Sequence, residues 1–262
     1  MTYTQLQQVL RSFWPKADKA PILDGAAFAA GVLESMSQDG DVLQVGRIAF
    51  RETPIGWVTI TPITRAEWRA YEPAPTEWKR TWVNESWEDN LPATDLTLKQ
   101  IEAFIDNINF SLPGTGLPGE CRLPTLGEAL TMALAVEDVS LPVNDYGTFS
   151  WQPWMQPVGF SMANAWGLWD TLGCVWQWCA DGPEGMDVVQ PTGTVYTYKR
   201  RFASGGSWKY SAKECLPEAF GGRGYFAIAM DERIQGRDLG FRLIVPKEGA
   251  GELTIDARQV DG

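Results

Sequence analysis

The fifteen residues from Gly167 to Asp181, GLWDTLGCVWQWCAD, constrain the fold of this chain more than any other segment. They hold three of the 13 tryptophans and two of the four cysteines. Large rings at this density bury much apolar surface, so they serve a core before they serve a binding surface. Two short blocks follow in order, GGSW at Gly205–Trp208 and GFR at Gly240–Arg242. The three blocks together predict a core built from short strands and tight glycine turns.

Composition indicates a globular protein and excludes several classes of partner. Of the 262 residues, 44% are hydrophobic and 21% are charged, which is close to ordinary globular usage. The net charge of −11 argues against nucleic acid, because phosphate binding needs a clustered basic face. No apolar run approaches the roughly 18 residues of a membrane span, and Met1–Phe13 lacks the pattern of a secretory signal. We expect no membrane insertion and cytoplasmic synthesis, with a virion or the cell surface as a destination after assembly.

Histidine is absent, and this absence excludes much chemistry. Ser-His-Asp and Cys-His nucleophile pairs cannot form, nor can a histidine act as general base. The cysteines show no CxxC pairing and fit no zinc spacing; they are Cys121, Cys174, Cys179 and Cys215. The sequence therefore predicts reduced, mostly buried thiols, no catalytic residue and no metal site.

Local signals divide the chain into three parts. Residues 1–40 carry helical spacing and are predicted to be a helical segment that packs on the main domain or forms a homo-oligomer. Residues 41–246 form the main domain, and 247–262 form a polar tail or a terminal strand. In the main domain, Val42–Phe50 and Gly56–Ile60 read as strands joined by a turn near Pro54.

Three capping boxes mark helix starts in the first half of the main domain. They begin at Thr64, Thr97 and Thr125, each with Glu or Gln three residues later. Beyond Glu137 the helical periodicity is lost, and short aromatic strands alternate with glycine and proline. Helices in the first half and irregular strands in the second predict an α+β fold of small mixed sheets, flanking helices and long loops.

Five blocks in order resemble the formylglycine-generating-enzyme-like (sulfatase-modifying factor) domain. Ile63–Trp68 is similar to its VTNAEY helix start, Cys121–Ala129 to its RLPTEAEWE block, and Pro157–Trp178 to its PVG…N…GLYDMxGNVWEW block. The GGSW and GFR blocks match as well. The resemblance covers about residues 42–246 and implies a C-type-lectin-like fold with a loop-rich binding face.

Departures from the family pattern bear on chemistry. The resemblance places the two copper-binding cysteines of the enzyme at Tyr210 and Cys215, so one thiolate is replaced by a phenol. Soft thiolate pairs select Cu(I), and a lone thiol does not replace the pair. The family's calcium-binding glutamate corresponds to Gln177, which keeps an oxygen but lacks the charge, so no cofactor is expected and structural calcium is doubtful. Cys174 stands where the family has asparagine.

What remains is noncatalytic use of the scaffold, as in diversity-generating-retroelement variable proteins and phage receptor-binding proteins. The resemblance implies a ligand face between GGSW and GFR, rich in the residue types that paratopes favour. The predicted ligand-binding residues are Trp208, Tyr210, Ser211, Lys213, Arg223, Tyr225, Asp231, Glu232 and Arg233. The expected partner is a protein or glycan receptor.

Three alternatives stay open. The interval between GGSW and GFR could consist of ordinary loop residues, with Phe226 and Ile228 in a core strand. The chain could be an oxidoreductase that uses Cys215, or a structural virion subunit attached through residues 1–40.

Overall fold

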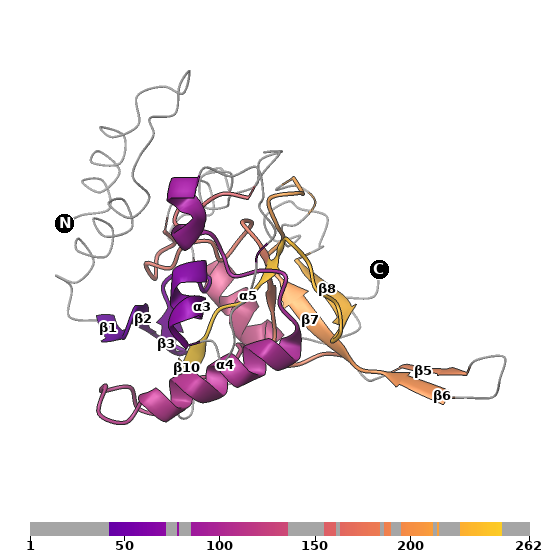
Figure 1. The fold of residues 1–262 in the computed structure, drawn as a ribbon, viewed down its shortest axis with the longest axis horizontal. Helices are drawn as coiled ribbons and strands as arrows, with labels where there is room; N and C mark the ends of the chain where they lie inside the picture. The colour runs from indigo at the N-terminus through magenta and orange to yellow at the C-terminus, as the bar shows by residue number, and fades with distance from the viewer. Residues whose placement is uncertain are drawn as a thin grey trace, which may run out of the picture.

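The computed structural model describes residues 42–71, 78, 85–135, 155–160, 163–183, 186–189, 195–211, 214 and 226–247. The predicted N-terminal segment 1–40 and most of the tail 247–262 lie outside these residues, so their roles stay predictions. Two four-stranded sheets and three helices form the body of the described chain, an α+β arrangement that confirms the predicted fold class (Figure 1).

The first sheet joins both ends of the domain. Its order is β1–β2–β3–β10, all antiparallel, with bounds β1 Val42–Val45, β2 Ile48–Thr53, β3 Gly56–Thr59 and β10 Ile244–Pro246. The sequence prediction of one strand over Val42–Phe50 is wrong, because a two-residue turn at Gly46 and Arg47 folds that segment into β1 and β2. Gly46 adopts φ +58°, a left-handed conformation that glycine reaches without steric cost. The predicted turn after Thr53 is confirmed.

The second sheet carries the aromatic block around Trp176 and Trp178 and the glycine of the GFR block. Its order is β8–β7–β4–β9, where β4 pairs parallel with β9 and the other pairs are antiparallel. The strand bounds are β4 Trp176–Trp178, β7 Arg200–Ser204, β8 Ala227–Asp231 and β9 Leu239–Gly240. A separate hairpin of β5 (Met186–Val189) and β6 (Val195–Tyr198) projects from the body (Figure 1).

The three predicted capping boxes all form. Helices α3 (Arg65–Tyr71), α4 (Leu98–Ser111) and α5 (Leu126–Leu134) begin directly after Thr64, Thr97 and Thr125, and a 3₁₀ helix η1 spans Glu85–Asn90. In each box the threonine hydroxyl accepts from the N3 backbone while the N3 side chain accepts from the threonine N–H. These local contacts explain why the helix starts could be read from sequence.

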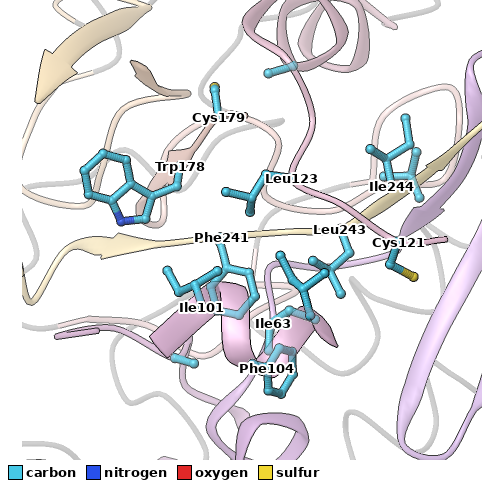
Figure 2. Close-up of a cluster of buried hydrophobic side chains, with 14 of the residues drawn as sticks. Ile63, Ile101, Phe104, Cys121, Leu123, Trp178, Cys179, Phe241, Leu243 and Ile244 are labelled. Atoms are coloured by element: carbon cyan, nitrogen blue, oxygen red, sulfur yellow. The ribbon is translucent and has the colours of Figure 1, made fainter. Parts of the chain in front are cut away.

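The main core lies between α4 and the segment from Phe241 to Val245 (Figure 2). Phe104 of α4 stacks on Trp68 of α3, with ring centroids 4.8 Å apart, and meets Phe241 edge-on at 5.5 Å. Trp178 is fully buried, and Trp176 is 3% exposed. The prediction that the rings of this segment serve the core is thus confirmed for both tryptophans, and Gly167–Asp181 is chiefly a fold element.

A buried arginine links this core to both sheets. The guanidinium of Arg242 donates to Gln177 Oε1 at 2.6 Å, to Thr59 O at 3.0 Å and to Trp169 O at 2.7 Å. Burial lowers the pKa of Arg242 to about 10, so the side chain stays charged at neutral pH. The arginine of the GFR block thus joins β3, β4 and the segment before β4.

Candidate functional site

The GGSW turn is held rigidly against the aromatic block. Gly205 and Gly206 adopt φ +92° and +78°, and a side chain at Gly205 would approach the Thr171 carbonyl oxygen at 3.0 Å. Gly173 N donates to Gly205 O at 2.7 Å, and Trp208 N donates to Cys174 O at 2.9 Å. Only glycine fits this close approach with these dihedrals. The turn therefore places Trp208 and the residues after it on a fixed support.

Trp208 and Tyr210 form the aromatic part of the site. Trp208 is half-buried and packs on a small apolar cluster made by Leu91, Met155, Cys174 and Val175. Tyr210 is 40% exposed, and its ring meets Trp176 edge-on with centroids 5.8 Å apart. An exposed ring whose inner edge rests on a buried tryptophan is a preorganised contact, because it loses little conformational freedom on binding.

A charged pair borders the aromatic rings. Lys209 Nζ lies 2.6 Å from Asp238 Oδ1 and 5.5 Å from the centre of the Trp208 ring. Ser207 Oγ donates to Asp238 Oδ2 at 2.8 Å. The lysine charge is thus neutralised within the site. Lys209 and Asp238 were not among the predicted site residues, and no local signal joins positions 29 residues apart.

Ser211 is engaged in an internal contact. Its N–H and hydroxyl both donate to Glu214 Oε2, at 2.9 and 2.7 Å. Glu214 N in turn donates to Ser211 O at 3.0 Å. The spacing Ser-x-x-Glu is the capping-box signal, which the sequence reading missed here. Ser211 therefore has a structural role at this turn.

The predicted acidic and basic residues lie at the other end of the sheet. Ala227 pairs with Ser204 beside the GGSW turn, whereas Asp231 pairs with Arg200 at the far end of β7. At the strand rise of 3.2–3.4 Å per residue, the Ala227 and Asp231 Cα atoms lie about 13 Å apart. The predicted ligand-binding residues thus fall into two groups.

Contacts within the far group are local. Arg233 donates to both carboxylate oxygens of Asp231, at 2.8 and 2.5 Å, and lowers the pKa of Asp231 to about 2. Glu232 Oε1 accepts from Arg201 Nε at 3.0 Å. Lys213, Arg223 and Tyr225 lie outside the described residues, so their assignment stays a prediction.

The residues at the family's metal positions do not fit the metals. At the first copper position Tyr210 presents a phenol, and Cys215 lies outside the described residues. At the calcium position the Gln177 oxygen faces the Arg242 guanidinium, so a second cation there would be repelled. Within the described ranges no cluster of three or more His, Cys, Asp or Glu side chains could hold a metal ion. We derive no chemistry through either ion.

The three described thiols are enclosed. Cys121, Cys174 and Cys179 are buried and free of disulfides. Burial raises the pKa of Cys121 and of Cys179 to about 12, and it also raises that of Cys174 well above its ordinary value. The thiolate is the reactive form of cysteine, so these side chains are poor nucleophiles.

We therefore expect iodoacetamide at pH 8 to label none of these three thiols in folded Cys215→Ser protein. The reason is that burial blocks the reagent and suppresses the thiolate. Intact-mass spectrometry should show no added carbamidomethyl group in buffer and three groups in concentrated guanidinium. Labelling of the folded protein at the rate of a free thiol would contradict the burial described above.

Comparisons with known proteins agree with this architecture. The family model described as "Sulfatase-modifying factor enzyme 1-like domain" matches residues 57–247. No curated protein matches the chain significantly. Among the described residues, no helix is long and apolar enough to cross a membrane.

Solved structures share the fold at low sequence identity. Treponema denticola variable protein 1 superposes with TM-score 0.57 and 17% identity, over 77% of this chain and 97% of its own length. CarF superposes with TM-score 0.52 and 16% identity, over 79% and 95%. At this identity the likeness shows the fold alone. With the family model covering most of its length and the blocks in the same order, the chain belongs to the sulfatase-modifying factor enzyme 1-like domain family.

Proposed function

We propose that this protein is a noncatalytic receptor- or ligand-binding protein of the kind encoded by diversity-generating retroelements or phages. The observation that carries the proposal is Tyr210, an exposed ring supported by Trp176 at the place of a family copper ligand. The fold likeness to a variable protein supports it. The ligand face is centred on Trp208, Lys209 and Tyr210 at the GGSW turn.

The charges around this face favour a protein or glycan receptor over an anionic ligand. Lys209 is already paired with Asp238, and its ammonium group lies over the Trp208 ring. Among the described residues, this face therefore offers aromatic surface and hydrogen-bonding groups, and its lysine is paired. Such surfaces gain affinity from apolar contact, so we propose binding that depends weakly on salt concentration.

Truncating the exposed ring is expected to weaken receptor binding about 30-fold. Tyr210→Ala removes an aromatic anchor, and anchors of this kind contribute about 2 kcal/mol or more at an interface. Arrays of purified surface proteins and of glycans would identify a ligand, and biolayer interferometry would then give the Kd of the wild type and of each variant.

The matched control is Phe110→Ala. Phe110 is 89% exposed at the C-terminal end of α4, so its loss removes a similar ring from another part of the surface. We expect this variant to bind like the wild type. Equal affinity of Tyr210→Ala and wild type for an identified receptor would refute the proposed face.

The enzyme alternative is tested separately. The protein should be supplied with Cu(I), dissolved oxygen as oxidant, a thiol reductant and a cysteine-containing peptide. Formation of formylglycine should be followed by mass spectrometry. We expect no turnover, because one of the two thiolates is replaced by Tyr210. Copper-dependent turnover that is lost in Cys215→Ser would overturn the noncatalytic assignment.

The retroelement origin has its own test in the genome. A variable gene of this kind should lie near a reverse transcriptase and a near-repeat of its own 3′ part. If both are absent, the retroelement assignment is wrong. The proposal of receptor binding is unaffected, because it rests on the ligand face at the GGSW turn.

A further inference from the structure

Strand β8 is the outer strand of the second sheet. Within the described chain it pairs only with β7, and its opposite side has no neighbouring strand (Figure 1). All five of its residues are half-buried, and its four apolar side chains pack against the main core. The strand therefore packs on the core, while one of its backbone edges pairs with no other strand of the described chain.

The hydrogen-bond alternation identifies which groups face outward. Gly205 N donates to Phe226 O, and Glu232 N donates to Lys199 O, so both of these pairs are hydrogen-bonded ones. Hydrogen-bonded pairs alternate along an antiparallel ladder. Residues 228 and 230 therefore bond inward to β7, and residues 227, 229 and 231 direct their backbone groups away from it.

The outward groups are largely unused. Among the described residues, the N–H groups of Ala227, Ala229 and Asp231 have no hydrogen-bond partner. The Ala229 carbonyl accepts a long bond from Arg200 Nη2 at 3.3 Å, and the Asp231 carbonyl accepts from Ile234 N. Three donors spaced two residues apart along one line match the acceptors of an extended polypeptide.

Apart from the Arg200 contact, the strand also lacks the usual protection of an edge. Natural edge strands carry lysine, proline or a bulge that discourages pairing. The sequence Ala-Ile-Ala-Met at 227–230 has none of these, and its register with β7 is continuous. The single charge, Asp231, stands at the end of the strand and is paired with Arg233.

We infer that the β8 edge binds an extended segment of a partner protein by strand addition. Main-chain hydrogen bonds to residues 227, 229 and 231 would supply affinity, as in other strand-addition complexes. A second copy of this chain fits less well. A five-residue edge is small beside the roughly 20–30 residues a side of a standard protein interface, whereas it suits a short peptide.

This site is distinct from the GGSW face. Tyr210 rests on β4, and β7 lies between β4 and β8. The inference therefore stands whether or not Tyr210 binds a receptor, and Tyr210→Ala should leave strand addition unchanged.

Amide exchange of the free protein is the first test. In ¹⁵N-labelled protein followed by NMR, we expect slow exchange at Ile228 and Met230 and fast exchange at Ala227 and Ala229. Protection of Ala227 and Ala229 in the monomer would mean that the chain covers its own edge, and this would overturn the inference.

Proline substitution is the second test. Ala229→Pro removes an outward N–H that the β7 ladder does not use, a placement that edge strands tolerate. The matched control, Ala229→Val, keeps the N–H, and Ala227→Pro serves if Ala229→Pro does not fold. The probe is a displayed library of random dodecapeptides selected on the immobilised full chain.

We expect selected peptides to slow amide exchange at Ala227 and Ala229 and to bind Ala229→Pro about tenfold more weakly than Ala229→Val. A library that yields no peptide dependent on these amides would overturn the inference. Sedimentation that shows a dimer lost in Ala229→Pro would assign the edge to a second copy, and so would also overturn it.

Discussion

Replacing Arg242 by methionine is expected to lower the free energy of unfolding by about 3–5 kcal/mol, a large part of a domain's total stability. Methionine keeps much of the side-chain volume but donates no hydrogen bond. The oxygens of Thr59, Trp169 and Gln177 would then be buried without their donor. Two of these oxygens belong to the backbone, so no second substitution could remove them.

Urea unfolding followed by tryptophan fluorescence would measure this loss. Arg47→Met is the matched control, because Arg47 is exposed in the β1–β2 turn, and its substitution should change stability by less than about 0.5 kcal/mol. The stability loss of Arg242→Lys should lie between those of the two methionine variants, since an ammonium keeps the charge but cannot reach three separate acceptors. A loss below about 1 kcal/mol for Arg242→Met would show that these hydrogen bonds contribute little.

Gly56→Ala is expected to cost about 3 kcal/mol and to loosen the pairing of β3 with β10. Gly56 adopts φ +142°, and an added Cβ would lie 2.3 Å from Val245 O and 2.9 Å from Pro246 Cα. These are backbone atoms, so the strand itself must move. Strain at such dihedrals and overpacking each contribute about 1–3 kcal/mol.

The chain offers a control that separates the two causes. Gly114 also has a positive φ, +87°, but nothing lies within 4 Å of an added Cβ. Gly114→Ala should therefore lower the free energy of unfolding only through the strained positive φ, by about 1 kcal/mol. Urea denaturation gives the stabilities. Amide exchange at Thr59 and Lys247, whose N–H groups donate to Leu243 O and Ile55 O, reports on the strand pair. Equal losses at Gly56 and Gly114 would argue against the steric contact.

Sequence signals predicted what short-range contacts determine. The capping boxes at Thr64, Thr97 and Thr125 each join residues three apart, so the pattern itself contains the interaction. The turn at Gly46 is equally local, yet the sequence pattern predicts one continuous strand there. A lone glycine between apolar alternations fits a continuous strand as well as a two-residue hairpin.

Long-range contacts were beyond sequence reading. The partners of Arg242 lie up to 183 residues away, and Lys209 meets Asp238 from across a loop. The separation of the predicted ligand-binding residues into two groups could not be predicted from the sequence for a related reason. Tyr210 and Asp231 both fall between the GGSW and GFR blocks, but β8 carries the chain to the opposite end of the sheet. Only the strand register reveals this separation.

The pairing of β10 with β3 also sets a time order for folding in the cell. Ile244 pairs with Val58, so the partner of β3 is among the last parts of this domain to be synthesised. At about 5–20 residues per second, a ribosome needs about 10–40 seconds to pass from one to the other. During that interval the edge of β3 and the oxygens awaiting Arg242 stay open. A chain that terminates before Arg242 can neither pair the β3 edge nor satisfy these oxygens. Chaperones and proteases can recognise such a chain by these exposed groups.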